Sequence, residues 1–417
     1  MTSEAETGRK AAVRGEPITG LGPWVYYAFF FLLPVQGVLA PKSIVVALLA
    51  AALLGLIVVW RSQAVRPWAE LDRPLAVGLG LLVLWSAAAS LWSFDPSRSL
   101  FLSLRIGCIF LAALVLHAMI RGIRQEAVRR RIGLCLVAGL CLALGLMTVE
   151  LAFGFPIGYA LREAEELGSD PAVWLNRGAT ALAILCWPAA AALWRTRLHW
   201  AAGVLICAAF GVLYFLSSLA AVVGVAAAGL VAAAALVYPK AGRVLIVLAT
   251  LAAVIGSPVL AQKSYEHDWQ TAGWLPFSAQ HRVEIWHFSV VRIAERPLAG
   301  WGFDSARAMK HVADDVEESG RSPVALHPHS APLQIMLELG LVGMVISLGL
   351  AWLLIRRLEE LPPPARAMGQ ACYTATLVIV CTSFGMWQNW WLALLCCAAV
   401  AVTATCAAPR GAPARAD

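Results

Sequence analysis

Long apolar runs separated by short polar segments make up most of the chain. Runs of about 17 to 22 apolar residues are long enough to cross the roughly 30 Å hydrocarbon core of a membrane as helices. The alternation that strands of a membrane barrel require is absent, so helices must do the crossing. The pattern predicts an all-α, polytopic transmembrane bundle. About twelve spans are expected, near residues 24–41, 43–60, 75–93, 101–120, 132–153, 177–194, 200–217, 219–238, 244–260, 335–354, 368–386 and 390–408.

One long polar segment, residues 261–334, interrupts this pattern. It separates nine predicted spans in residues 24–260 from three in residues 335–408, and polar tails at 1–23 and 409–417 flank the bundle. Six of the eight histidines lie in the polar segment: His267, His281, His287, His311, His327 and His329. Because such a loop adds little to the stability of a lipid-soluble bundle, we expect it to carry the chemistry.

Basic residues gather on one side of this predicted topology. The clusters are Arg9, Lys10 and Arg14; Arg61, Arg66 and Arg73; Arg121, Arg124, Arg129, Arg130 and Arg131; Arg195 and Arg197; Lys240 and Arg243; and Arg356, Arg357 and Arg366. The positive-inside rule places this side, and with it both termini, in the cytoplasm. The polar segment then lies outside. The net charge of +7 therefore reports topology and gives no reason to expect a nucleic-acid partner.

Two helix boundaries are predicted at the polar segment. Apolar positions at helical spacing in residues 281–295 predict an amphipathic helix that lies at the outer membrane surface. Pro297 ends this helix, and Gly300 and Gly302 supply a sharp turn. At the other end of the segment, Ser330 is a good N-cap for span ten.

His329 directly precedes this predicted helix start. The positive end of the helix dipole disfavours protonation of a nearby imidazole, so His329 is a candidate neutral base. The exposed N–H groups of the same helix end also attract anions such as phosphate. An interfacial histidine without a chemical role is the alternative.

Four charged residues near the predicted outer ends of helices are further candidates. Arg282 is suited to bidentate phosphate binding, but it also fits a solvated helix face. Arg177 starts span six at membrane depth, where a cation needs a partner. Arg105 lies in span four, where its side chain can also extend to the membrane interface. Glu338, about 13 Å along span ten from His329, more readily pairs within the bundle than reacts.

Metal and nucleotide sites find little support in the sequence. All ten cysteines fall in predicted spans, where free cysteine behaves as a small hydrophobe. His327 and His329 form an H-x-H pair without a matching cysteine or carboxylate spacing. P-loop, G-x-S-x-G and H-E-x-x-H patterns are absent. No metal or cofactor is predicted.

Three blocks of the polar segment and span ten together resemble the O-antigen ligase/polymerase family. They are R-x-x-I-W (Arg282, Ile285, Trp286), P-L-x-G-x-G (Pro297, Leu298, Gly300, Gly302) and H-P-H-x-x-x-L-Q-x-x-x-E-L-G-x-x-G (His327, Pro328, His329, Leu333, Gln334, Glu338, Leu339, Gly340, Gly343). Asn176-Arg177-Gly178 and the turn around Asp95 and Pro96 are also similar to that family.

The resemblance implies a metal-independent glycosyltransferase of the bacterial inner membrane with a periplasmic active site. Such enzymes take a glycan from an undecaprenyl-diphosphate carrier and pass it to an acceptor hydroxyl, here on lipid A-core or on a growing glycan. By analogy, His329 is the general base, and Arg282 binds the diphosphate and stabilises the leaving charge. The supporting residues would be His327, Ser330, Trp286, Glu338, Gly300 and Gly302.

Two positions depart from the family pattern. Members commonly have asparagine after the catalytic histidine, where this chain has Ser330. Many also carry an arginine where span eight begins, whereas residues 217–221 contain none. Arg177 is expected to bind the diphosphate in its place, with Arg105 as a second candidate.

Three functions remain in competition. A ligase would move a finished glycan to its acceptor, and a polymerase of the same family would extend O-antigen or exopolysaccharide on the shared lipid carrier. A transporter of lipid-linked glycans without catalysis predicts polar residues at the middle of the spans, but those found here cluster at the outer ends. The sequence therefore favours an enzyme but does not separate ligase from polymerase.

Overall fold

The computed structural model describes residues 22–62, 67–161, 171–216, 218–312 and 326–407, and all regular secondary structure in them is helical. This confirms the prediction of an all-α polytopic bundle. The predicted tails (except Gly22 and Pro23) and residues 313–325 of the polar segment lie outside the described residues.

Ten helices in the described ranges are long and apolar enough to cross a membrane. They are α2 (Gly22–Leu39), α3 (Ser43–Ser62), α4 (Arg73–Ala89), α5 (Pro96–Gly122), α6 (Glu126–Ala152), α9 (Asn176–Arg195), α11 (Leu219–Val237), α12 (Pro239–Glu266), α14 (Ala331–Glu359) and α16 (Asn389–Cys406). The two other predicted spans correspond to α10 (His199–Tyr214), which is apolar but shorter, and to α15 (Pro363–Thr382), which is not among the ten. Each predicted span therefore coincides with a helix, and the chain is a multi-pass membrane protein.

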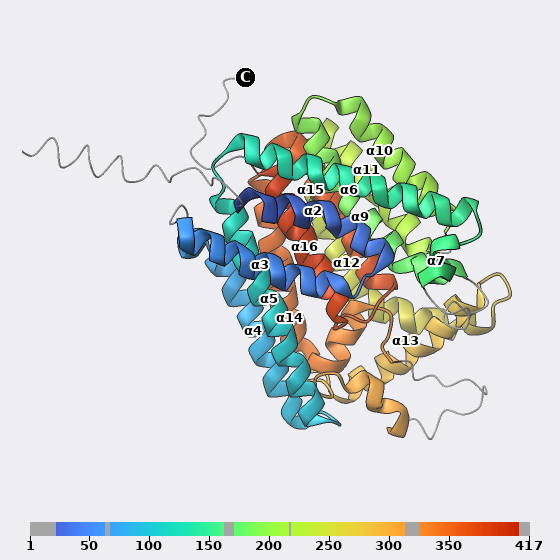
Figure 1. The fold of residues 1–417 in the computed structure, drawn as a ribbon. Helices are drawn as coiled ribbons and strands as arrows, with labels where there is room; N and C mark the ends of the chain where they lie inside the picture. The colour runs from blue at the N-terminus through green and yellow to red at the C-terminus, as the bar shows by residue number, and fades with distance from the viewer. Residues whose placement is uncertain (1–21, 63–66, 162–170, 217, 313–325, 408–417) are drawn as a thin grey trace, which may run out of the picture.

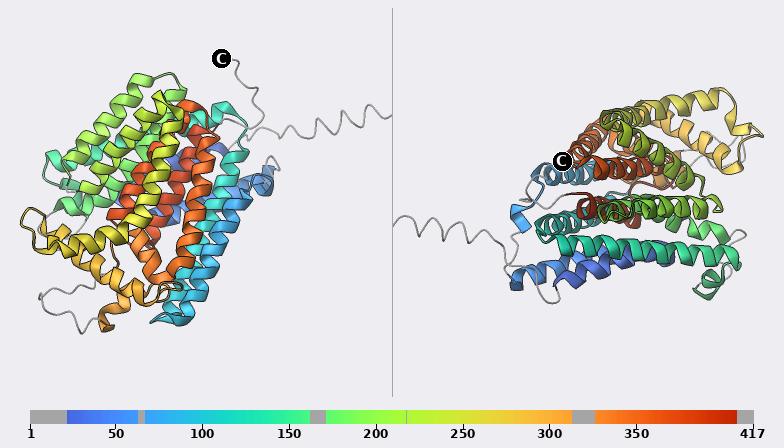
Figure 2. Two further views of the ribbon diagram at one scale, coloured as in Figure 1. Left: turned by 180° about the vertical axis from the view of Figure 1, so that it is seen from behind. Right: turned by 90° about the horizontal axis from the view of Figure 1, so that it is seen from above.

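Helix α9 lies at the centre of the bundle. It packs against α2, α6, α10, α11, α15 and α16, and 89% of its apolar window is buried inside the protein. Its alanine-rich sequence lets neighbouring backbones approach closely, as membrane helix packing requires. Figure 1 shows α2 and α3 in front of this centre and α4, α5 and α14 beside it, and Figure 2 shows the helices in layers when viewed from above.

The polar segment begins later and is more helical than its sequence boundaries suggest. Helix α12 continues to Glu266, so its last turn takes up residues expected in the loop. The amphipathic helix forms as α13 (Phe277–Glu295) and ends just before Pro297, as predicted. It packs against α12 and α14 and lies at one end of the bundle (Figure 1).

Helix α14 is broken at Gly340, which has φ 63° and ψ −163° inside an otherwise helical run. We call residues 297–303, which follow α13, the inserted turn. Four backbone hydrogen bonds join the two segments: Trp301 N to Leu337 O (2.9 Å), Gly302 N to Glu338 O (3.0 Å), Leu341 N to Pro297 O (2.8 Å) and Val342 N to Leu298 O (3.3 Å). The groups that a continuous helix would pair with one another are thus paired with the inserted turn, so the break leaves these polar groups satisfied.

The inserted turn fits only because three glycines lack side chains. A Cβ on Gly340 would lie 2.3 Å from Leu298 O, and one on Gly300 would lie 2.5 Å from the Glu338 carbonyl carbon. A Cβ on Gly302 would lie 2.5 Å from Ser93 Cα. The P-L-x-G-x-G and E-L-G patterns therefore pack against each other. We call this contact between residues 297–303 and residues 337–342 the interlock.

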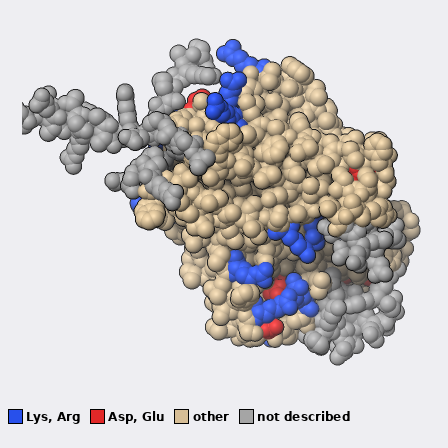
Figure 3. Space-filling view, in the orientation of Figure 1, with Lys and Arg blue, Asp and Glu red and all other residues tan. Residues whose placement is uncertain are grey.

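Basic side chains occupy both ends of the bundle. Helices α5, α9 and α14 begin at the end where α13 lies and finish at the other end with Arg121, Arg195 and Arg357. There Asp72 binds Arg121 (3.0 Å) and Arg357 (2.7 Å). On the face seen in Figure 3, Lys and Arg gather in an upper and a lower group, with acidic atoms among the lower one.

Candidate active site

His329 is held at the entrance to α14 in a strained backbone conformation. Its φ is 55°, which is rare for a residue with a Cβ and stores energy of order 1–3 kcal/mol. Its Nδ1 lies within hydrogen-bonding distance of the Ser383 carbonyl. Because a carbonyl oxygen only accepts, Nδ1 must carry the proton, and Nε2 is left with a free lone pair.

The surroundings of His329 favour the neutral imidazole. Burial lowers its pKa below the usual 6.5, the Ser383 carbonyl works in the opposite direction, and the positive charge of Arg282 lowers the pKa further. The sequence also predicted a lowered pKa for His329, but from the helix dipole, whereas the largest cause in the structure is burial.

His327 packs against His329, with their ring centroids 4.3 Å apart. Burial, together with the charges of His329, Arg307 and Arg282, lowers its pKa to about 4. Gln388 Nε2 lies 3.2 Å from His327 Nε2, and a Cβ on Gly385 would lie 2.6 Å from the His327 ring. The connection between α15 and α16 therefore forms one wall of the site.

This connection, residues 383–388, corrects the predicted end of the eleventh span. Span 368–386 was expected to be helical to its end, but α15 stops at Thr382. The freed residues supply the Ser383 carbonyl to His329 and the backbone N–H of Met386 to Gln334 Oε1 (2.8 Å).

Helix α13 brings Arg282 and Trp286 to the same place. Trp286 Nε1 donates to the Pro328 carbonyl at 2.8 Å and so holds the backbone between the two histidines in place. Arg282 is partly buried, which lowers the pKa of its guanidinium, and its charge acts on both histidines. The R-x-x-I-W and H-P-H blocks thus meet in space.

The two other predicted arginines differ in position. Arg177, in the first turn of α9, lies over the Trp390 ring at 5.4 Å, and Trp390 Nε1 donates to Gln388 Oε1 at 2.8 Å. Arg177 therefore adjoins the wall that contacts His327. Arg105 is exposed on α5, where its guanidinium lies 5.5 Å from the Phe101 ring centroid, and no contact within the described ranges links it to His329.

Glu338 is a buried structural junction. Its carboxylate accepts from Gln334 Nε2 (3.0 Å), Trp387 Nε1 (2.7 Å) and the backbone N–H of Asp304 (2.8 Å). It thereby ties α14 to residues 383–388 and to the residues that follow the inserted turn. Gly300 and Gly302 belong to the same junction through their close approach to α14 and Ser93.

Ser330 occupies the N-cap position of α14, as predicted, but its hydroxyl makes no capping hydrogen bond. The side chain is buried, and its Oγ has no partner in the described part of the chain.

We expect Ser330→Ala to keep or slightly raise thermal stability. Loss of a working N-cap typically costs about 1 kcal/mol, whereas removal of an unpaired buried hydroxyl is close to neutral or favourable. Thermal unfolding of the purified variant in detergent would measure this. A clear fall in Tm would mean that the hydroxyl does cap the helix.

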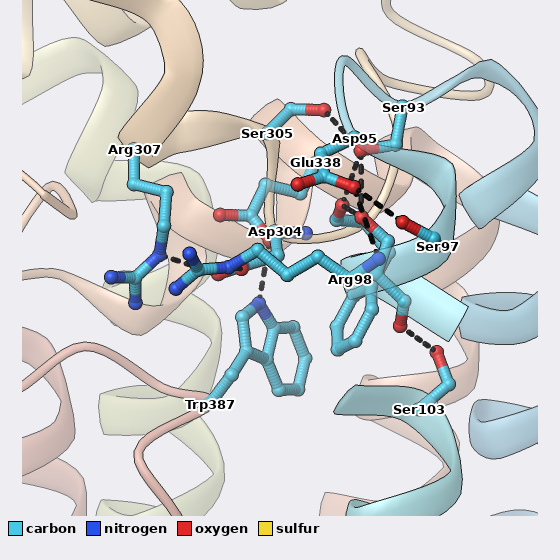
Figure 4. Close-up of polar contacts among 12 residues, drawn as sticks. Ser93, Asp95, Ser97, Arg98, Ser103, Asp304, Ser305, Arg307, Glu338 and Trp387 are labelled. Carbon is cyan, nitrogen blue, oxygen red and sulfur yellow. Dashed lines mark hydrogen bonds and ion pairs between the residues drawn. The ribbon is translucent and has the colours of Figure 1, made fainter. Parts of the chain in front are cut away.

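A cluster that the sequence analysis missed lies beside the inserted turn. Asp304, also at positive φ (56°), binds Arg98 Nε and Arg307 Nε at 3.0 Å each (Figure 4). Ser93 and Ser99 donate to the Phe303 carbonyl at 2.8 and 2.7 Å. The turn around Asp95 was noted in the sequence, but no periodic pattern shows that it packs against residues 303–307.

Within the described residues no group of three or more His, Cys, Asp or Glu side chains is placed to hold a metal ion. A cavity of about 620 Å³ with mainly apolar walls runs between α4, α5, α12, α14, α15 and α16. Ala331, Pro332 and Trp387 line it near the histidines, and Asp72, Arg121 and Arg357 line it at the other end.

Comparisons with known proteins find one family and one group of relatives. Residues 177–348 match a family described as O-antigen ligase. A protein of Rickettsia bellii named "Putative polysaccharide ligase" is 26% identical over 88% of this chain and 95% of its own length. Relatives with the same description from Rickettsia typhi (29% identity, 52% of this chain, 55% of the relative) and Rickettsia felis (28%, 60% and 63%) match over shorter stretches.

Residues 177–348 are thus similar to the O-antigen ligase family, and the chain over most of its length is similar to a curated polysaccharide ligase. The region matched to the family contains Arg177, Arg282, the two histidines and Glu338, together with the α14 break. Arg98 and residues 383–388 lie outside the matched region, although they contact it directly.

Proposed function

We propose that this protein transfers a glycan from an undecaprenyl-diphosphate carrier to an acceptor hydroxyl, as a ligase of lipopolysaccharide or cell-surface polysaccharide biosynthesis. The observation that carries the proposal is His329, whose Nδ1 is committed to the Ser383 carbonyl while Nε2 keeps its lone pair. The similarity of residues 177–348 to the O-antigen ligase family and the names of the curated relatives support the ligase class.

His329 Nε2 would act as the general base. It would take the proton of the acceptor hydroxyl as that oxygen attacks the anomeric carbon of the glycan and the bond to the carrier diphosphate breaks. The lowered pKa keeps the imidazole neutral near pH 7, and the positive φ of His329 fits a residue held for function.

Arg282 would bind the diphosphate and stabilise the charge that develops on it as the bond breaks. A guanidinium keeps its charge when partly buried and matches two phosphate oxygens at once. Arg177 would add a second positive charge from the Gln388 side of the site. With cations in these positions, the proposed transfer needs no metal ion.

The lipid chain of a substrate would lie in the 620 Å³ cavity. One end of the cavity reaches the start of α14 beside His329, and its apolar lining suits an isoprenoid or acyl chain. An amphiphile placed there would hold its polar head at the histidines.

We propose that the site faces the periplasm and that both termini lie in the cytoplasm of a bacterium with an inner membrane. Helices α5, α9 and α14 carry Arg121, Arg195 and Arg357 at the ends remote from the histidines, as the positive-inside rule expects for a cytoplasmic side. Acceptor glycolipids and membrane lipids are the expected partners.

The pH dependence of transfer tests the environment of the base. His329 is active when neutral, so activity should fall as pH decreases through its pKa, which burial and Arg282 place below 6.5. Arg282→Gln removes a positive charge that lowers the pKa of His329, so the acidic limb of the kcat/KM profile should move to higher pH. Arg282→Lys keeps the charge and should leave the limb near its wild-type position. An acidic limb that stays in place in Arg282→Gln would contradict this account.

Deleting the gene separates ligase from polymerase. Loss of a ligase leaves long polymer on the lipid carrier, whereas loss of a polymerase leaves single repeat units. The ligase proposal predicts that the long carrier-linked polymer accumulates. Accumulation of single repeat units would contradict the ligase proposal and favour a polymerase.

A further inference from the structure

Arg98 and Arg307 form a fork around Asp304, and the outer ends of their guanidiniums have no hydrogen-bond partner among the described residues. Each guanidinium uses its Nε to bind one oxygen of Asp304, at 3.0 Å. In the ranges that the structure describes, these Nε contacts are the only hydrogen bonds of either guanidinium, so the Nη donors of both arginines are left to bind a further acceptor. Their side chains are 55% and 33% exposed, whereas that of Asp304 is 5% exposed.

The fork is fixed by the same interlock that shapes the site. The backbone N–H of Asp304 donates to Glu338 Oε2 at 2.8 Å, and the preceding carbonyl of Phe303 accepts from Ser93 and Ser99. These bonds hold the backbone of Asp304 in place, and the two arginines hold its carboxylate. Figure 4 shows the two guanidinium groups side by side in front of it.

The charge of this group is unbalanced. One carboxylate binds two guanidiniums, so these three side chains carry one net positive charge. The exposed Asp95 carboxylate also acts on Arg98 through its charge, but its hydrogen bonds go to the Arg98 backbone N–H and to Ser97 Oγ. A phosphate oxygen pair would relieve the repulsion between the two guanidiniums and accept hydrogen bonds from the Nη groups, as guanidinium geometry favours.

The fork lies within electrostatic reach of the histidines. The positive charge of Arg307 contributes to the lowered pKa of His327, alongside that of Arg282. An anion on the fork would therefore sit near the H-P-H residues.

We propose that the Arg98–Arg307 fork binds a phosphate group of a substrate. The inference rests on the proposed glycan transfer for the identity of that substrate, which is either the donor through its diphosphate or an acceptor glycolipid that carries phosphate. In both cases the fork is a binding group and His329 remains the base.

Binding of inorganic pyrophosphate to the purified full-length protein in detergent tests the fork without any turnover. The measurement is made in an Arg282→Gln background, so that the fork contributes more of the signal. Adding Arg98→Gln or Arg307→Gln should weaken binding by about tenfold or more, the loss expected for a charge-assisted contact. Lys263→Gln, which removes a cation from the exposed pair with Glu266, is the control and should leave binding unchanged.

Unchanged pyrophosphate affinity in both fork variants, with wild-type Tm, would overturn the proposal.

If the fork variants do weaken binding, transfer kinetics identify the source of the phosphate. A raised KM for the lipid-diphosphate donor indicates the donor, and a raised KM for the acceptor indicates the acceptor. Partial recovery by Arg98→Lys and Arg307→Lys supports binding over a structural role. If the wild-type protein transfers no glycan, the proposed function fails, yet the pyrophosphate result still decides whether the fork binds phosphate.

Discussion

Gly340→Ala is expected to yield a protein that is strongly destabilised or fails to fold. Alanine at φ 63° costs about 1–3 kcal/mol in backbone strain alone. Its Cβ would also lie 2.3 Å from Leu298 O, so the inserted turn would have to separate from α14. The four backbone hydrogen bonds between the two segments would then lose their partners inside the protein.

Folding of this variant can be measured as the monodisperse fraction in size-exclusion chromatography and as Tm in detergent. Gly349→Ala is the matched control, because it lies in the same helix and a Cβ there meets no atom within 4 Å. Helix propensity should make that control neutral or slightly stabilising. Gly300→Ala should behave like Gly340→Ala, and wild-type stability in both would show that the interlock does not hold the fold.

His329→Ala is expected to lower the rate of glycan transfer by about 10²- to 10⁴-fold, the usual contribution of a general base. Folding should be retained, because the substitution removes one hydrogen bond to Ser383 and leaves Trp286 and Gln388 to hold the neighbouring residues. The rate is measured with purified protein, a lipid-diphosphate-linked glycan and an acceptor.

His267→Ala is the control for this substitution, since His267 is exposed at the C-terminal end of α12 and lies in the same polar segment. It should transfer glycan at the wild-type rate. Equal rates for His329→Ala and the wild type would remove His329 as the base.

The pattern of apolar runs was sufficient to locate the helices. Each of the twelve predicted spans contains a helix, because length and hydropathy of a membrane helix are local properties of the sequence. The break at Gly340 was not predicted, because it depends on hydrogen bonds with residues some forty positions away. The hydropathy of an apolar run is the same whether its helix is straight or broken.

The candidate site was predicted in part. The blocks containing Arg282, Trp286 and His329 do meet, and Arg177 adjoins them through Trp390. Arg105 was grouped with them on its distance along a helix, but it points to Phe101. Direction around a helix depends on neighbouring helices, which a single hydropathy pattern does not give.

Residues 383–388 and the Arg98–Asp304–Arg307 group were missed for a related reason. Ser383 acts through its backbone carbonyl, which carries no residue-specific signal. Asp304 and Arg98 are joined across more than two hundred residues, and charged side chains in short loops ordinarily suggest only solvent exposure. The Gly385 and Gln388 positions at the end of an apolar run are the available hint that the span ends early.

Glycan transfer in proteoliposomes tests the central claim most directly. Purified wild-type protein is mixed with an undecaprenyl-diphosphate-linked glycan and an acceptor glycolipid in the presence of EDTA, and both products are quantified. The account predicts one free undecaprenyl diphosphate for each glycan joined to the acceptor, with formation of both lost in His329→Ala. Movement of the intact lipid-linked glycan across the bilayer without cleavage of its diphosphate bond would contradict it.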